Sequence, residues 1–136
     1  MVDIRPVVTS FLRFQNKILL LQRSSKVGTY QGKWGGCSGY IEKNENPDFR
    51  AITEIQEETK LEETQIKLIK KGTPLEIIDE QMGITWIVHP YLFEIATDQI
   101  QLDWEHKNYM WIAPEEINKF KTVPNLKETY DRIKNT

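Results

Sequence analysis

The sequence predicts an α/β fold in which a mixed β-sheet lies between helices, an α/β/α sandwich. Three observations predict it. Segments rich in β-branched and aromatic residues follow one another along most of the chain. Residues 46–60 have the periodicity and the end signals of an amphipathic helix. A second segment of helical character closes the chain, so that few helices accompany many strands.

The first two strands are expected to pair as a hairpin. Residues 6–14 combine β-branched and aromatic side chains, and residues 17–24 form the apolar run of a buried strand. The Gln-Asn pair between them is a turn signal. Residues 26–39 contain five glycines, which indicates a loop with a short strand at its end.

The segment 46–60 is the clearest helix. Asn46 is a favourable N-cap, and Pro47 suits the first helical position because its missing N–H would be unpaired there anyway. Side chains at steps of three and four form the stripe expected to face the sheet, namely Phe49, Ile52, Ile55 and Thr59.

The second half of the chain continues with strands and two short helices. The expected elements are strands over residues 64–78 with a break at Gly-Thr-Pro, a strand over 84–95 that Pro90 interrupts or places at an edge, a strand followed by a helix from near Pro114, and a C-terminal helix from Pro124 with Leu126, Tyr130 and Ile133 apolar.

Composition points to one globular domain over residues 1–136. A net charge of −2 provides no basic surface for a nucleic acid polymer. No apolar run approaches the roughly 20 residues that cross a bilayer, so a membrane is not an expected partner either. The lone cysteine and the absence of a signal-peptide pattern fit a cytoplasmic protein.

Three carboxylates crowd the predicted helix. Glu54, Glu57 and Glu58 are spaced i, i+3 and i+4 and therefore share one face, near the negative end of the helix dipole. Their repulsion is unfavourable unless a cation offsets it, and Mg²⁺ prefers such oxygen ligands. Taken alone, the cluster is more typical of a solvated acidic face than of a metal site.

The surroundings of the cluster resemble the motif of the Nudix (MutT-like) hydrolases, G-x5-E-x7-R-E-U-x-E-E-x-G-U, in which U is aliphatic. Seven of its nine fixed positions match: Gly39, Glu45, Glu54, Ile55, Glu57, Glu58 and Leu61. The resemblance extends to the hairpin before the motif, to Trp34, and to the segment 111–117.

The resemblance implies a loop–helix–loop on a Nudix fold that binds two or three Mg²⁺ or Mn²⁺ ions, which hold a pyrophosphate while water attacks phosphorus. By position, Glu57 and Glu58 are the expected metal ligands, and Glu54 is a ligand or a proton acceptor. The backbone carbonyl of Ser38 matches a further ligand of the family. Glu105, before the late tryptophan, is a candidate extra ligand or general base, with an exposed loop carboxylate as the alternative.

Two positions depart from the motif. Thr53 replaces an arginine that normally holds the motif glutamates, and we expect Arg50, one turn earlier on the same face, to take over that role. Lys60 replaces the glycine that ends the helix. Lysine can adopt the left-handed turn at a cost of about 1 kcal/mol, or the helix continues.

These departures leave alternative functions open. The chain could be a weakly active Nudix-fold module that senses a nucleotide. Isopentenyl diphosphate isomerases also resemble it and use a cysteine, for which Cys37 is the candidate, although the Cys-x-His-Pro sequence of those enzymes is absent.

The resemblance implies a small-molecule substrate, a nucleoside diphosphate linked to another moiety X. Tyr30, Trp34 and Trp86 are candidate stacking partners for a base, with core packing as the alternative for each. Nudix proteins are often dimers, and a homodimer is left open.

Overall fold

The computed structural model describes residues 3–134. Its elements are β1 (Asp3–Phe14), β2 (Lys17–Arg23), β3 (Trp34–Gly35), β4 (Cys37–Tyr40), α1 (Pro47–Thr59), the 3₁₀ turn η1 (Glu63–Gln65), β5 (Ile66–Lys71), β6 (Leu75–Asp79), β7 (Ile84–Ile95), β8 (His106–Ile112), the 3₁₀ helix η2 (Pro114–Lys119) and α2 (Leu126–Asp131). None of these helices is long and apolar enough to cross a membrane.

The sheet is mixed, as predicted. Strands β1 and β7 run parallel at its centre, and the remaining pairs are antiparallel. The principal order is β3-β2-β1-β7-β5, with β4 added to β1, β6 to β7 and β8 to β2. The predicted β1–β2 hairpin is present, and its turn residues Gln15 and Asn16 have φ angles of 50° and 66°.

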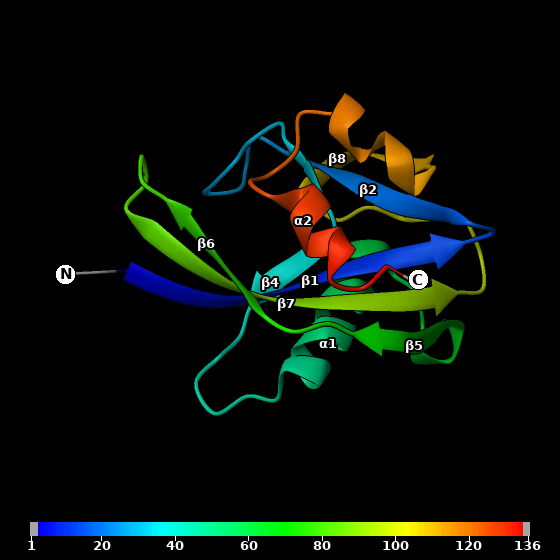
Figure 1. Ribbon diagram of the computed structural model, residues 1–136. Coiled ribbons are helices and arrows are strands. Elements are labelled where there is room, and N and C mark those ends of the chain that lie inside the picture. The colour runs from blue at the N-terminus through cyan, green and yellow to red at the C-terminus, as the bar shows by residue number, and fades with distance from the viewer. Residues whose placement is uncertain (1–2, 135–136) are drawn as a thin grey trace.

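Helices cover both faces of this sheet (Figure 1). In β2, Leu19 and Leu21 pack toward α1, whereas Ile18 and Leu20 pack toward η2 and α2. This alternation follows from the two-residue period of a strand and gives the sheet two separate apolar cores. The expected α/β/α sandwich is confirmed.

The expected stripe of α1 is wrong at its first position. Phe49 is 62% exposed, and the helix instead buries Ala51, Ile55 and Thr59 together with Glu54 and Glu58. Because two glutamates occupy part of the buried face, the helix is rotated so that Phe49 points to solvent. The carboxylates, and not only the apolar residues, therefore determine how α1 lies on the sheet.

The expectation that Pro90 interrupts β7 or places it at an edge is also wrong, because β7 is continuous and central. On the side of β7 that pairs with β5 and β6, Lys71 is opposite Tyr91 and Leu75 is opposite Val88. Pro90 faces the gap between those two partner strands, where its carbonyl accepts from Gly72 N–H at 2.9 Å. Its missing N–H thus leaves no ladder bond unmade.

The ends of α1 agree closely with the sequence signals, whereas the two later helices differ from the expected ones. Asn46 caps α1, and Lys60 closes it in the left-handed conformation with φ 62° and ψ 16°, so the helix does not continue. The segment after β8 forms a 3₁₀ helix rather than an α-helix. Helix α2 begins at Leu126, later than expected, because Asn125 adopts a left-handed φ of 59°.

Candidate active site

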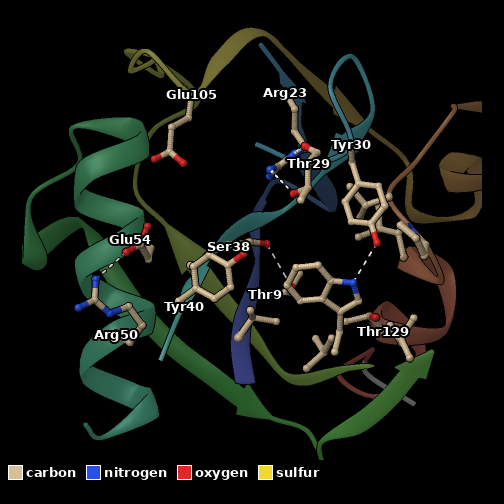
Figure 2. A pocket seen from close by; sticks show the side chains of 18 of the residues that line it. Thr9, Arg23, Thr29, Tyr30, Ser38, Tyr40, Arg50, Glu54, Glu105 and Thr129 are labelled. Atoms are coloured by element: carbon tan, nitrogen blue, oxygen red, sulfur yellow. Dashed lines mark hydrogen bonds and ion pairs between the residues drawn. The ribbon is translucent and has the colours of Figure 1, made fainter. Parts of the chain in front are cut away.

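A cavity of about 360 Å³ opens beside β4, between α1 and the end of β2. Figure 2 shows Arg50, Glu54 and Glu105 on one side of it and Tyr30 and Thr129 on the other, with Arg23 between Glu105 and Tyr30. The charged lining comprises Arg23, Glu42, Arg50, Glu54, Glu57 and Glu105, and the aromatic lining comprises Tyr30, Tyr40 and Trp86. The cavity therefore has an acidic end and an aromatic end.

Three glutamates converge at the acidic end. Carboxylate oxygens of Glu54, Glu58 and Glu105 all lie within 4.8 Å of one another. Two of these residues come from α1, and the third comes from the loop before β8, far away in the sequence. Glu57 lies outside this group; it is exposed and lines the cavity nearby.

Glu54 packs directly on the backbone of β4. A Cβ atom added at Gly39 would overlap the carboxyl group of Glu54. The fixed glycine of the motif is therefore explained here by close approach of a side chain, since any larger residue would displace the carboxylate.

Arg50 links Glu54 to the loop before the helix. Its Nε and Nη2 donate to the two oxygens of Glu45, both at 2.8 Å, and its Nη1 donates to Glu54 at 2.6 Å. Glu45 also accepts from the backbone N–H of Glu42, which closes the loop. Hydrogen bonds from Arg50 hold the pKa of Glu45 below its usual value.

Glu58 is buried without a hydrogen-bond partner. Its exposed fraction is 0%, and neither carboxylate oxygen has a partner among the described residues. His106 lies nearby, with Nε2 at 3.7 Å from Oε1. Burial, followed by the neighbouring carboxylates of Glu54 and Glu105, raises the pKa of Glu58 well above its usual value.

An unpaired buried carboxylate is unfavourable, and a hard divalent cation supplies the missing partner. Three carboxylates lie within reach of one point, and one of them has no hydrogen-bond partner within residues 3–134. This donor set fits Mg²⁺ or Mn²⁺. The acidic end is accordingly a candidate metal site.

Glu105 is fixed in place by the end of β2. Its carbonyl accepts from Ser24 N–H at 2.8 Å, and the carbonyl of Trp104 accepts from the Ser24 hydroxyl at 2.8 Å. Burial, with contributions from Asp103 and Glu54, raises the pKa of Glu105 to about 7, while Arg23 acts in the opposite direction.

Arg23 and Tyr40 are functional candidates of the lining that the sequence did not single out. Arg23, at the end of β2, points a guanidinium into the cavity and donates to the carbonyl of Thr29 at 2.9 Å. Tyr40 follows the motif glycine at a position that the motif leaves variable. A cation at the end of a predicted strand is a weak signal for Arg23, and nothing in the sequence marks Tyr40.

The other predicted residues divide between the cavity and the core. Ser38 lines the cavity, as do Tyr30 and Trp86. Trp34 does not, because its ring packs edge-on against Phe120 in the core beneath η2 and α2. Cys37 is likewise a core residue, 1% exposed and outside the cavity lining.

We predict that Gly39→Ala destabilises the protein by about 1–3 kcal/mol, since the new methyl group overpacks against Glu54. Urea unfolding of the variant measures the change. Gly28→Ala is the matched control because nothing lies within 4 Å of a Cβ there. Equal stability of the two variants would contradict the close approach.

We predict a pH-dependent stability difference between wild type and Glu105→Gln in EDTA. The carboxyl pKa rises from 4.5 to about 7 on folding, so the folded state holds this proton more tightly. The resulting stabilisation is present below pH 4.5 and is lost as the pH rises through 7. The melting temperature of Glu105→Gln relative to that of wild type should therefore rise between pH 5 and pH 8.

Comparing the two proteins at each pH isolates Glu105 from the histidines, which titrate in both. A constant difference across this range would rule out the raised pKa. Adding Mg²⁺ at pH 8 should raise the melting temperature of wild type more than that of the variant.

Comparisons with known proteins agree with this geometry. The family model of the NUDIX domain matches residues 3–133. No curated protein matches the chain. Among solved structures, a MutT protein from Methanosarcina mazei Go1 is similar with a TM-score of 0.80 and 22% identity over 96% of this chain and 93% of that one.

Two further structures are similar over nearly the whole chain. A MutT NUDIX hydrolase from Burkholderia pseudomallei has a TM-score of 0.77 and 19% identity over 97% of this chain and 99% of that one. An Ap4A hydrolase from C. elegans has a TM-score of 0.71 and 20% identity over 96% and 94%. The chain therefore belongs to the NUDIX domain family, a family of pyrophosphate hydrolases, as its motif predicts.

Proposed function

We propose that this protein is a Mg²⁺- or Mn²⁺-dependent pyrophosphohydrolase that cleaves a nucleoside diphosphate linked to another moiety. The observation that carries the proposal is the unpaired carboxylate of Glu58 within the group Glu54, Glu58 and Glu105, at one end of an open cavity. The solved structures named MutT and Ap4A hydrolase support a nucleotide as the substrate.

Glu54, Glu58 and Glu105 would hold the metal. Glu57 and the carbonyl of Ser38, at the same end of the cavity, are the further donors expected from the motif. When bound, the metal neutralises phosphate charge and lowers the pKa of an attacking water.

The arginines of the cavity position a metal ligand and neutralise the charge of the phosphates. Arg50 fixes the carboxylate of Glu54 from the loop side. It thereby takes the role of the motif arginine, whose position Thr53 occupies here. Arg23 presents a cation to the phosphates from the opposite side of the cavity (Figure 2). Glu105 is either the additional ligand or the general base, since it reaches the same point as Glu54 and Glu58 from the loop before β8.

The two alternatives lose their support in this geometry. The departures at Thr53 and Lys60 favour a sensor module, but Arg50 contacts Glu54 and Lys60 still ends the helix. An isomerase would need its cysteine beside the substrate, whereas Cys37 is buried in the core outside the cavity lining. We further propose a single cytoplasmic domain acting on small phosphoanhydrides, with no nucleic acid polymer or membrane as partner.

A screen for phosphate release tests the proposal. Nucleoside di- and triphosphates, sugar nucleotides and dinucleoside polyphosphates are offered with Mg²⁺, and added pyrophosphatase detects pyrophosphate. We expect at least one substrate, with kcat/KM lowered about 100-fold or more in Glu58→Gln, because even outer partners of metal ligands contribute 10- to 100-fold. EDTA should abolish the activity.

The matched control is Glu94→Gln, which removes a carboxylate that pairs with Arg13 away from the cavity. Activity that survives EDTA, or that Glu58→Gln retains, would contradict the proposed metal site. Silence across the panel, with the fold intact, would contradict the nucleotide substrate.

Arg50→Ala tests the positioning role of that residue. We predict a fall in kcat of roughly 10- to 100-fold with a smaller change in KM, since the arginine orients a ligand and does not bind substrate. Arg50→Lys should recover little, because an ammonium cannot pair with Glu45 bidentately. Arg13→Ala, which breaks one surface ion pair, is the control. An unchanged kcat in Arg50→Ala would contradict the positioning role of Arg50.

A further inference from the structure

The aromatic end of the cavity is built around the indole of Trp86. The ring of Tyr40 lies 6.1 Å from it at an interplanar angle of 31°, and the ring of Tyr30 lies 6.1 Å away at 52°. The guanidinium of Arg5 sits over the indole at 5.7 Å. Trp86 itself is only 8% exposed, so its faces are taken by protein groups. It supports the other two rings more than it offers a surface of its own.

Tyr40 is the ring that remains available. It is 49% exposed and lines the cavity. Arg5 donates to its hydroxyl at 3.1 Å, and Asp3 in turn holds that guanidinium with two hydrogen bonds. The ring is thus fixed at its tip by Arg5 and backed by Trp86, while much of its surface stays free.

The position of Tyr40 relates the ring to the acidic end. Ser38 and Tyr40 are two residues apart in β4 and therefore project from the same side of the strand. Figure 2 shows Tyr40 between the Arg50–Glu54 pair and the side of the cavity that holds Tyr30. A group stacked on this ring would lie beside phosphates bound at the glutamates.

The polar groups of the aromatic end are already used within the protein. The indole N–H of Trp86 donates to the Tyr30 hydroxyl at 2.9 Å, and that hydroxyl donates to Asp79 at 2.7 Å. Thr129 donates its hydroxyl proton to the carbonyl of Asn125 at 2.9 Å. The hydroxyl of Thr9 pairs with that of Ser38 at 3.2 Å, and the hydroxyl of Thr29 accepts from Arg23 at 3.2 Å. The remaining side chains of this part of the lining are aliphatic: Val7, Ile77, Val88, Val123, Pro124 and Leu126.

A binding surface of this kind recognises the flat face of an aromatic ring rather than the hydrogen-bonding groups at its edge. Stacking tolerates any base because every base has a π-face, whereas strong discrimination needs unpaired donors and acceptors that meet the base edge. A hydrophilic group such as a sugar would lose hydration here without gaining partners.

We propose that Tyr40 stacks a flat aromatic group of the substrate, and that this end of the cavity accepts it by shape without reading its hydrogen-bonding edge. The inference rests on the proposed function for the placement of the phosphates. It deepens that function by assigning an aromatic base, of any identity, to the moiety beside β4 and by naming the residue that selects it.

Binding of nucleoside monophosphates tests the inference apart from catalysis, because these compounds contain no anhydride to cleave. Isothermal titration of wild type in Mg²⁺ with AMP, GMP, CMP and UMP should give dissociation constants within about fivefold of one another, with the purines tightest. Ribose 5-phosphate, which lacks a base, should bind roughly tenfold more weakly.

Variants identify the ring responsible. Tyr40→Leu should weaken nucleotide binding roughly tenfold, to the level of ribose 5-phosphate, and leave ribose 5-phosphate itself unchanged. Tyr40→Phe keeps the ring and should stay within about twofold of wild type. Tyr109→Leu is the matched control, since Tyr109 is 37% exposed on β8 and lies outside the cavity lining.

Four outcomes would overturn the inference: a preference of about 100-fold for one base, equal binding of ribose 5-phosphate, no effect of Tyr40→Leu in a folded variant, or no binding of any nucleotide at millimolar concentration. Base-tolerant binding in a protein that hydrolyses no anhydride would overturn the proposed function and leave this inference standing. Metal-dependent hydrolysis in a protein that binds ribose 5-phosphate as tightly as the nucleotides would overturn this inference and leave the proposed function standing.

Discussion

The burial of two glutamates of α1 against the sheet is the constraint on which the rest of the site depends. Glu54 and Glu58 are 8% and 0% exposed, on a helix face that would otherwise be apolar. Burial of charge is unfavourable without compensation. Around these residues the chain supplies an arginine, a glycine that leaves room for a carboxyl group, and one carboxylate with no partner.

Compensation differs between the two glutamates. Glu54 is neutralised by Arg50, which also holds Glu45 and so ties the loop to the helix. Glu58 has no such partner, and its raised pKa expresses the free energy of keeping it there without a cation. A carboxylate that the described protein groups leave uncompensated is a candidate partner for a cation, whereas a fully compensated cluster would have no use for one.

The two ends of the cavity offer different kinds of interaction. At the acidic end, charge and hydrogen bonding act on groups that are nearly the same in every phosphoanhydride. At the aromatic end, rings and methyl groups line a surface on which the donors of Trp86, Tyr30 and Thr129 are bonded to other protein groups. Under the proposed function, the first end holds the phosphates and the second end selects the group attached to them.

Local chemistry accounts for what the sequence predicted well. The cap at Asn46, the spacing of the glutamates and the alternation of the strands are short-range properties, so the helix, the mixed sheet and the family followed from the sequence. Its errors also have local causes. Periodicity alone treats glutamates as exposed, and it therefore predicts Phe49 on the buried face. A proline is ordinarily excluded from a central strand, and Pro90 therefore predicts an interrupted or edge strand.

What the sequence by itself determined is the motif helix with its carboxylates, because a helix places residues three and four apart on one face wherever it lies. Only the tertiary structure decided which carboxylates meet. The pairing of β8 with β2 brings Glu105 to Glu54 and Glu58, while the rotation of α1 leaves Glu57 outside. The same packing placed Trp34 in the core and Tyr40 at the cavity, since burial depends on contacts between segments far apart in the chain.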